Sequence, residues 1–385
     1  AKFLPMIKIP LIAFLILPVF LFATKKTAHE EVVAWTFRTS APVVASPALS
    51  DGMIYIGSLD STFYAINVKT GKEKWHFKSA DLISSTAVIS NGLCYFESGN
   101  ILYAVNRKGK LKWKHVLCPG ELTNKLDPWD FQHSSPVVHE GVVYIGTEQG
   151  ILLGVDAKSG KQVLRCQTLS EHAIRSTPVI SDGLVMYGDW DGVFYASHTE
   201  SGSLAWKYDT KKDGTFSWVN AIHGCPRVHD GQVYFAGRSC RLYSLDVRTG
   251  KKNWHYSSPT DQWLLGGPEV NGGTVFLGSS DQHLFHAFDS ENGELLWTTK
   301  MDGRTWGKAC VEGDRLYIGS NSFYVLQKSN GELIKEISFP KVHEDRYYGE
   351  YVDRIANFHS SPLVYKNMAI LGSDDGNVYA INLDD

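Results

Sequence analysis

The chain has 385 residues, 43% of them hydrophobic and 12% aromatic, with a formal net charge of −3. This composition is typical of a folded globular protein, and the small net charge argues against a nucleic-acid-binding protein that depends on a basic surface. A chain of this length usually forms two or three domains. Here internal repeats place residues 31–385 in a single domain.

Residues 1–30 differ from the rest of the chain. An apolar run from Ile9 to Ala23 lies between Lys8 and the pair Lys25–Lys26. This run is short for a membrane-spanning helix and suits the core of a signal peptide, although counting from Phe3 it could just span a bilayer. We therefore expect an N-terminal hydrophobic helix that is either a cleaved signal peptide or a retained membrane anchor. Both place the rest of the chain outside the cytoplasm, in the periplasm, and the second anchors it to the inner membrane.

The first repeat runs from Ser46 to Trp75. Asp51-Gly52 is a two-residue hairpin turn with apolar residues on both sides, and β-branched and aromatic residues predict strands at 54–57 and 63–66. A further turn ends at Gly71, four residues before the tryptophan. Four short strands joined by tight turns make one blade of a β-propeller.

The unit recurs eight times, with spacings of 40 to 53 residues. Its copies open with Pro or an equivalent residue at Pro47, Ala87, Pro136, Pro178, Pro226, Pro268, Ala309 and Pro362. The last copy stops after its third strand, at residues 378–382, and an orphan strand at residues 33–37 precedes the first copy. We expect these two strands to pair, because a closed ring has no exposed strand edge. The predicted fold is all-β, an eight-bladed β-propeller of four-stranded blades, or a seven-bladed one if residues 308–335 are not a blade.

Long insertions lead into the innermost strands of several blades, at residues 118–134, 208–224, 256–266 and 339–360. They share one face of the ring and contain many aromatic residues. We expect this face to bind partner proteins, the alternative being that the loops fold back over the propeller as lids. The residues predicted to contact a partner are Trp129, Phe131, Phe216, Trp218, Trp263, Tyr347, Tyr348 and Tyr351.

A second set of residues stands three positions before the opening Pro of a blade: His133, Arg175, His223, Trp306 and His359. Equivalent positions in a ring converge, so we expect these side chains at the mouth of the central channel, where they could bind an anion or a carboxylated ligand. The alternative is a wet, polar channel mouth with hydrogen-bonding imidazoles. Because the residues stand on separate blades, we expect no tight metal site, and no motif predicts catalytic residues.

The six cysteines are far apart and form no CxxC pair, which excludes a zinc knuckle and covalently attached haem. Cys225 and Cys240 lie in the same repeat and either form a disulfide or remain free thiols.

The segments at residues 64–75 and 242–254 resemble the quinoprotein-type, or PQQ-like, propeller repeat: an aromatic residue, Ala, Leu and Asp, then Thr-Gly, and Trp four residues later. The resemblance covers residues 33–383 and implies the propeller fold. One branch of this family consists of alcohol and sugar dehydrogenases that bind pyrroloquinoline quinone and calcium. The other is a cofactor-free, BamB-like scaffold branch.

The length, the eight repeats and the export segment are similar to those of the BamB-like branch. That resemblance implies a non-catalytic, membrane-anchored extracytoplasmic propeller that scaffolds a membrane-associated protein complex. Its partners would be subunits of that complex, with no cofactor and no nucleic acid. The alternative is an oxidoreductase or small-ligand binder that holds pyrroloquinoline quinone with calcium at the channel mouth.

Overall fold

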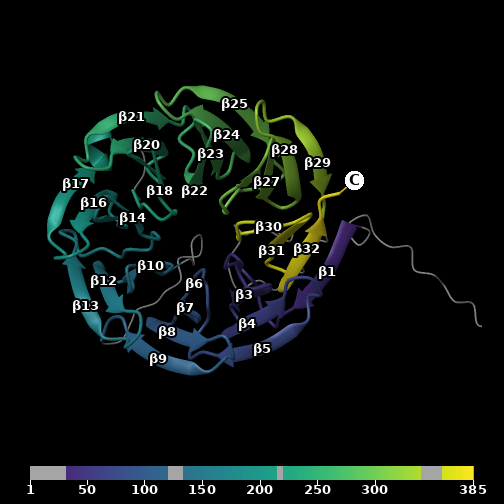
Figure 1. Cartoon of the computed structure of the whole chain (residues 1–385). Coiled ribbons are helices and arrows are strands. Elements are labelled where there is room, and N and C mark those ends of the chain that lie inside the picture. Colours follow the sequence, from purple (N-terminus) through teal and green to yellow (C-terminus); the bar gives the residue numbers. More distant parts are fainter. Residues whose placement is uncertain (1–31, 120–132, 215–219, 340–357, 385) are drawn as a thin grey trace, which may run out of the picture.

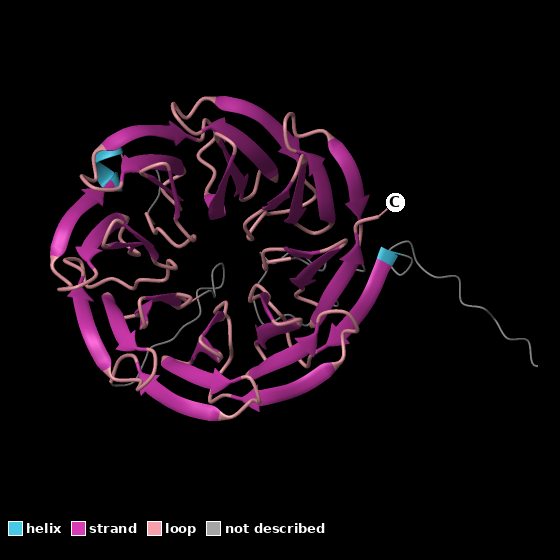
Figure 2. Ribbon diagram, in the orientation of Figure 1, coloured by secondary structure: helices cyan, strands magenta, loops and turns pink. Residues whose placement is uncertain are grey.

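A computed structural model describes residues 32–119, 133–214, 220–339 and 358–384. Its strands form eight four-stranded antiparallel sheets in a ring around a central channel (Figures 1 and 2). This confirms the predicted eight-bladed propeller over the seven-bladed alternative. The expected N-terminal helix lies outside the described residues. Within them, no helix has both the length and the apolar character needed to cross a membrane.

In each blade the strands follow one another from the channel outward. Blades 1 to 4 contain β2 (Ala48–Ser50), β3 (Met53–Ser58), β4 (Thr62–Asn67) and β5 (Glu73–Lys78); β6 (Val88–Ser90), β7 (Leu93–Ser98), β8 (Ile101–Asn106) and β9 (Leu111–Val116); β10 (Val137–His139), β11 (Val142–Gly146), β12 (Ile151–Asp156) and β13 (Gln162–Gln167); β14 (Val179–Ser181), β15 (Leu184–Gly188), β16 (Val193–His198) and β17 (Leu204–Asp209), followed by the short 3-10 helix η1 (Thr210–Asp213).

Blades 5 to 8 repeat the pattern. They contain β18 (Arg227–His229), β19 (Gln232–Ala236), β20 (Arg241–Asp246) and β21 (Lys252–Ser257); β22 (Leu264–Asn271), β23 (Thr274–Ser279), β24 (Leu284–Asp289) and β25 (Leu295–Lys300); β26 (Cys310–Glu312), β27 (Arg315–Gly319), β28 (Phe323–Gln327) and β29 (Leu333–Ile337); and β30 (Leu363–Tyr365), β31 (Met368–Gly372), β32 (Asn377–Asn382) and β1 (Val33–Arg38).

The ring closes through its two ends. The eighth sheet has the order β1-β32-β31-β30, so its outermost strand comes from the N-terminal end of the propeller. β1 and β32 pair antiparallel, with Phe37 opposite Val378. The predicted closure is therefore confirmed, and blade 8 contains strands from both ends of the described chain.

The recurring tryptophans join neighbouring blades. The Trp35 indole Nε1 donates a hydrogen bond of 3.0 Å to the Val68 carbonyl oxygen. The ring also lies on Gly71, which has φ +66° and whose added Cβ would be 2.7 Å from the indole. Only glycine has both this backbone conformation and this clearance, so the turn glycine of one blade accommodates the tryptophan of the preceding blade. The same contact joins Trp75 to Gly109, Trp113 to Gly160, Trp206 to Gly250, Trp254 to Gly293 and Trp297 to Gly331.

The hydrophobic core consists of clusters between adjacent blades. Phe63 of blade 1 stacks on Phe96 of blade 2 with ring centroids 4.2 Å apart, and Phe194 of blade 4 stacks on Phe235 of blade 5 at 4.0 Å. Stacked rings of this kind add to the free energy gained by burial. All six cysteines are free thiols, so Cys225 and Cys240 do not form a disulfide in this structure.

Candidate functional site

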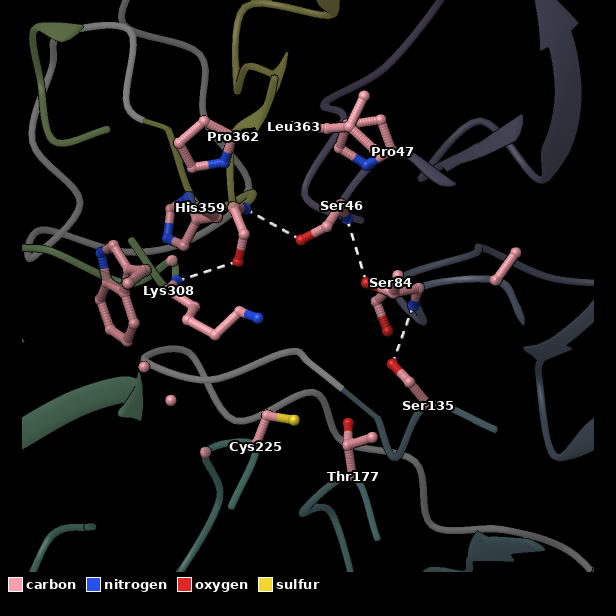
Figure 3. A pocket seen from close by; sticks show the side chains of 18 of the residues that line it. Ser46, Pro47, Ser84, Ser135, Thr177, Cys225, Lys308, His359, Pro362 and Leu363 are labelled. Atoms are coloured by element: carbon pink, nitrogen blue, oxygen red, sulfur yellow. Dashed lines mark hydrogen bonds between the residues drawn. The ribbon is translucent and has the colours of Figure 1, made fainter. Parts of the chain in front are cut away.

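The central channel contains a cavity of about 470 Å³, part of which is seen in Figure 3. All five residues predicted at the channel mouth line it: His133, Arg175, His223, Trp306 and His359. Lys308 adds a further cation, and no Asp or Glu belongs to the lining within the described part of the chain. The wall of the cavity therefore carries cationic and potentially cationic side chains.

His133 forms a buried pair with a carboxylate. Its Nδ1 lies 3.1 Å from Glu97 Oε2, and both side chains are less than a tenth exposed. Burial acts to lower the pKa of His133, but the charge and hydrogen bond of Glu97 outweigh it, so the pKa lies above its ordinary value. This pair links β7 of blade 2 to the segment that leads into blade 3.

Arg175 belongs to a cluster of arginines and tryptophans joined by cation–π contacts. Its guanidinium donates two hydrogen bonds to the Glu148 carboxylate, from Nε to Oε1 at 3.0 Å and from Nη2 to Oε2 at 2.8 Å. The Arg175 Cζ lies 4.5 Å from the centroid of Trp190, and Arg238 Cζ lies between Trp190 at 4.8 Å and Trp263 at 4.6 Å. Each cation therefore faces the electron-rich surface of a ring. Trp190 and Arg238 were not predicted, because no local motif identifies them.

His359 and Trp306 form a stacked pair with ring centroids 4.9 Å apart. His359 Nδ1 also lies 2.8 Å from Asp374 Oδ1, and both of these side chains are buried. His223 is buried and lies edge-on to Trp190, at 6.3 Å between centroids. All five predicted residues are thus joined to one another or to a neighbour that the sequence pattern did not identify.

A chain of hydrogen bonds that was not predicted runs around part of the channel. In each case a backbone N–H directly before an opening Pro, or its Ala equivalent, donates to the side-chain hydroxyl of a neighbouring blade. Ser361 N donates to Ser46 Oγ at 2.9 Å, Ser46 N to Thr86 Oγ1 at 3.1 Å, and Thr86 N to Ser135 Oγ at 2.9 Å. Lys308 N donates to Ser361 Oγ, and Figure 3 draws these contacts as dashed lines. Hydroxyl groups therefore tie blades 7, 8, 1, 2 and 3 together.

The other side of the channel wall is held by ion pairs. The equivalent positions are Cys225, Gly267 and Lys308, which have no hydroxyl. Glu269 accepts there from Arg227 at 3.1 Å and pairs with Lys308 Nζ at 3.1 Å. The cavity thus has a hydroxyl-lined side, and on the other side the lining residue Lys308 pairs with Glu269, which does not itself line the cavity.

The described residues do not fit a calcium-assisted quinone site. Calcium takes six or more oxygen ligands, and nowhere in the described ranges do three His, Cys, Asp or Glu side chains group closely enough to hold a metal ion. Arg175 and Lys308 suit an acidic molecule by charge, but each is already paired with a carboxylate, Glu148 and Glu269. We derive no reaction step through such a cofactor.

Most of the aromatic residues predicted to bind a partner fall outside the described residues: Trp129, Phe131, Phe216, Trp218, Tyr347, Tyr348 and Tyr351. Trp263 is described, and it stands half-buried over Arg238 just before β22. The segment predicted as a loop at 256–266 is partly strand, because β22 begins at Leu264 and pairs with β23. Partner binding by these aromatic residues stays a prediction.

Comparison with known proteins gives a family match over nearly the whole propeller. The family described as "Outer membrane protein assembly factor BamB" matches residues 27–208 and 210–383. Proteins of that name from Moranella endobia and Yersinia pestis are each 24% identical, over 73% and 89% of this chain and 68% and 72% of their own lengths. A tetrathionate hydrolase from Acidithiobacillus ferrooxidans is 23% identical over 66% of this chain, and the match spans 56% of that relative.

Solved structures share the fold at lower identity. BamB from Moraxella catarrhalis superposes with a TM-score of 0.68 and 18% identity, covering 91% of this chain and 99% of that one. The quinohemoprotein alcohol dehydrogenase from Comamonas testosteroni gives 0.69 and 13%, covering 91% and 76%. One fold therefore serves a protein named as an assembly factor and a protein named as an enzyme, so function has to be argued from the site.

Proposed function

This chain belongs to the family described as outer membrane protein assembly factor BamB, and we propose that it is a non-catalytic scaffold subunit of a membrane-associated protein complex. The observation that carries the proposal is the family match across both halves of the ring, residues 27–208 and 210–383. Two relatives with that printed name align with most of this chain. Their named role in outer-membrane protein assembly is what we transfer here.

The interior of the channel mouth supports a scaffold. Two of its buried histidines are paired with carboxylates, His133 with Glu97 and His359 with Asp374, in contacts that brace the inner parts of the blades. Buried polar groups that find partners make a structure rigid and specific. A rigid ring with loops on one face suits a subunit that holds other proteins in position. Of the aromatic residues predicted to contact a partner there, Trp263 lies within the described residues, over Arg238.

The proposed location is outside the cytoplasm. The family description points to work at the outer membrane, whereas the sequence predicted attachment to the inner membrane through residues 1–30. We propose that the chain is attached to a membrane through that segment. Fractionation of source-cell membranes on a density gradient tests it: recovery of the chain with either membrane supports attachment, and recovery only in the soluble periplasmic fraction overturns it.

Co-purification tests the scaffold role itself. The full chain is extracted from source-cell membranes in mild detergent, purified by a C-terminal tag, and its partners are quantified by mass spectrometry. We expect membrane-assembly subunits at a fixed ratio to the chain. A protein that reproducibly purifies alone, with no partner after chemical crosslinking, would overturn the proposal.

A second candidate function rests on the cavity of about 470 Å³ and its cationic lining. These features favour a small acidic ligand bound without a metal ion, for which a quinone carboxylate such as pyrroloquinoline quinone is one example. Titration calorimetry with that quinone in calcium-free buffer tests the candidate on the wild type and on Arg175→Gln. Heat of binding that falls in the variant would support it, and no heat with either sample would remove it.

A further inference from the structure

The residue directly before the outermost strand differs in charge between blades. In blades 1 to 7 this residue directly follows the glycine of the last turn, and we call the surface formed by the outermost strands the rim. This residue is Lys72, Lys110, Lys161 and Lys251 in blades 1, 2, 3 and 5, and Ser203 in blade 4. In blades 6 and 7 it is Glu294 and Glu332. The residue at this one position is therefore basic in four blades and acidic in blades 6 and 7, where Glu294 and Glu332 directly precede β25 and β29. The strands themselves also carry Lys300 and Lys335.

Exposed aliphatic side chains follow these two glutamates. Leu295 and Leu296 are 41% and 51% exposed, and Leu333 and Ile334 are 48% and 42% exposed. The equivalent pair in blade 1 is Glu73–Lys74. Blades 2 to 4 each expose one large aliphatic residue here, so blades 6 and 7 carry twice as many.

A β-bulge turns one residue of each pair away from the sheet. Ala287 pairs with Trp297 and Phe288 with Leu295, so Leu296 has no partner in β24. The same shift leaves Ile334 without a partner in β28. Bulges protect sheet edges from unwanted pairing, and a charged residue usually adds to that protection. Blades 1 and 2 have Lys74 and Lys112 at the bulge. Blades 6 and 7, like blade 3 with Val163, have an aliphatic side chain there that the fold does not bury.

The two blades form one continuous surface. The turn of blade 7 lies against β25, because an added Cβ on Gly331 would be 2.4 Å from the Trp297 ring. Thr299 Oγ1 donates to the Gly331 carbonyl oxygen at 2.6 Å. Leu333 follows two residues after this contact, and Figure 1 shows β25 and β29 one after the other along the outside of the ring. A single bound segment can therefore contact both pairs of aliphatic residues.

The two rim carboxylates are not neutralised within the described ranges. Neither Glu294 nor Glu332 lies within ion-pair distance of a described Lys, Arg or His side chain. Both residues are exposed. An acidic residue beside two exposed aliphatic residues, repeated on the next blade, is complementary to a chain that carries the opposite charge beside apolar groups.

Residues 294–296 and 332–334 together form what we call the acidic–aliphatic rim. We propose that this rim docks a short segment of a partner protein in which Lys or Arg alternates with aliphatic or aromatic residues. The inference rests on the proposed scaffold function and names the chemistry of the partner. The glutamates attract the basic side chains, and Leu295, Leu296, Leu333 and Ile334 supply apolar contact area. An anionic lipid surface would be repelled by the same carboxylates.

Matched variants of the full chain test the proposal. The probe is a short fluorescent peptide of alternating Lys and Leu, and its control replaces Lys with Glu. We expect the Lys–Leu peptide to bind the wild type and to bind about tenfold more weakly to Glu294→Lys/Glu332→Lys and to Leu296→Ala/Ile334→Ala. Glu73→Lys/Glu200→Lys and Val163→Ala/Leu204→Ala make the same chemical changes on other blades and should leave binding within about twofold. Unchanged thermal unfolding of all four variants shows that the ring is intact.

Several results would overturn the proposal. Equal weakening in the control variants, or equal binding of the Glu–Leu peptide, would remove the rim as a basic-segment site. A wild-type dimer in sedimentation that the rim variants abolish would identify a second copy as the occupant, and flotation with phosphatidylglycerol vesicles that they abolish would identify lipid.

Co-purification separates this proposal from the scaffold role. Loss of a complex subunit from both rim variants, but from neither control, supports the rim. Retention of every subunit by the rim variants overturns the rim and leaves the scaffold role standing. Absence of subunits from the wild type overturns the scaffold role, whatever the peptide shows.

Discussion

Trp35 should be the most sensitive single point of ring closure. It stands on β1, the strand that completes blade 8, and its side chain contacts blade 1. It is 8% exposed, its Nε1 donates to the Val68 carbonyl oxygen at 3.0 Å, and its ring covers Gly71. Replacing a buried tryptophan with alanine costs about 3–5 kcal/mol, from lost burial and the cavity that remains. We therefore expect Trp35→Ala to lower the free energy of unfolding by about 4 kcal/mol.

Two further substitutions separate the parts of this effect. Trp35→Phe keeps most of the ring but removes the indole N–H, so we expect a loss of about 1 kcal/mol from the missing hydrogen bond and a further loss from the smaller ring. Trp75→Ala removes the same contact between blades 1 and 2, but Trp75 is less buried. Its loss should therefore be smaller than that of Trp35→Ala.

Urea unfolding followed by far-UV circular dichroism measures all three variants. Limited proteolysis should also cut Trp35→Ala near residue 33 before any other site, because its closing strand is held less tightly. A Trp35→Ala variant that loses less than about 1 kcal/mol, or no more than Trp75→Ala, would refute the idea that this tryptophan holds the ring closed.

Three more predictions concern buried histidines and turn glycines. Burial lowers the pKa of His286 to about 4, so the protein should lose up to about 3 kcal/mol as the pH falls from the ordinary histidine pKa toward 4, and His286→Gln should reduce that loss in urea unfolding. The pKa of His133 is raised by Glu97 despite burial, so protonation of His133 stabilises the fold. This stabilisation is complete below the ordinary histidine pKa and is lost as the pH rises through the raised pKa of His133. It should be absent from the pH dependence of urea unfolding in Glu97→Gln. Gly250 and Gly183 both have left-handed φ, but an added Cβ at Gly250 meets an indole ring at 2.5 Å whereas that at Gly183 meets nothing within 4 Å. Gly183→Ala should therefore cost about 1 kcal/mol and Gly250→Ala at least about 1 kcal/mol more, measured by thermal unfolding.

The fold could be predicted because its determinants are local. Asp51 and Gly52 have the positive φ values, 48° and 74°, that a two-residue hairpin turn requires, and the same dipeptide type recurs in most repeats. The tryptophan four residues after a turn glycine is also a short-range pattern. The closing strand at residues 33–37 was identifiable because the last repeat lacked a fourth strand.

The candidate site could be predicted only in part. Equivalent positions in a ring must converge, so the repeat spacing alone predicts His133, Arg175 and His359 around the channel, and all three line it. Their carboxylate partners were not evident, since Glu97 stands where most other repeats have glycine and its pair with His133 forms between blades. Such contacts depend on how neighbouring blades pack against each other, and a local sequence pattern does not indicate that packing.

The exposed rim could also be predicted only in part. Glu294, Leu295 and Leu296 can be located in the repeat from the sequence, but the repeat does not indicate that their side chains remain exposed. The bulge at Leu296 and the contact of Trp297 with the next blade decide this. A docking surface on the rim is therefore evident only in three dimensions, whereas the number of blades follows from the repeats.

Isolation of the full chain from its native membranes in mild detergent, with mass spectrometry and an absorption spectrum of the same sample, tests the scaffold role most directly. The scaffold role predicts complex subunits at a fixed ratio to the chain and absorbance from aromatic residues alone. A chain that purifies alone and carries a quinone absorption band would contradict it.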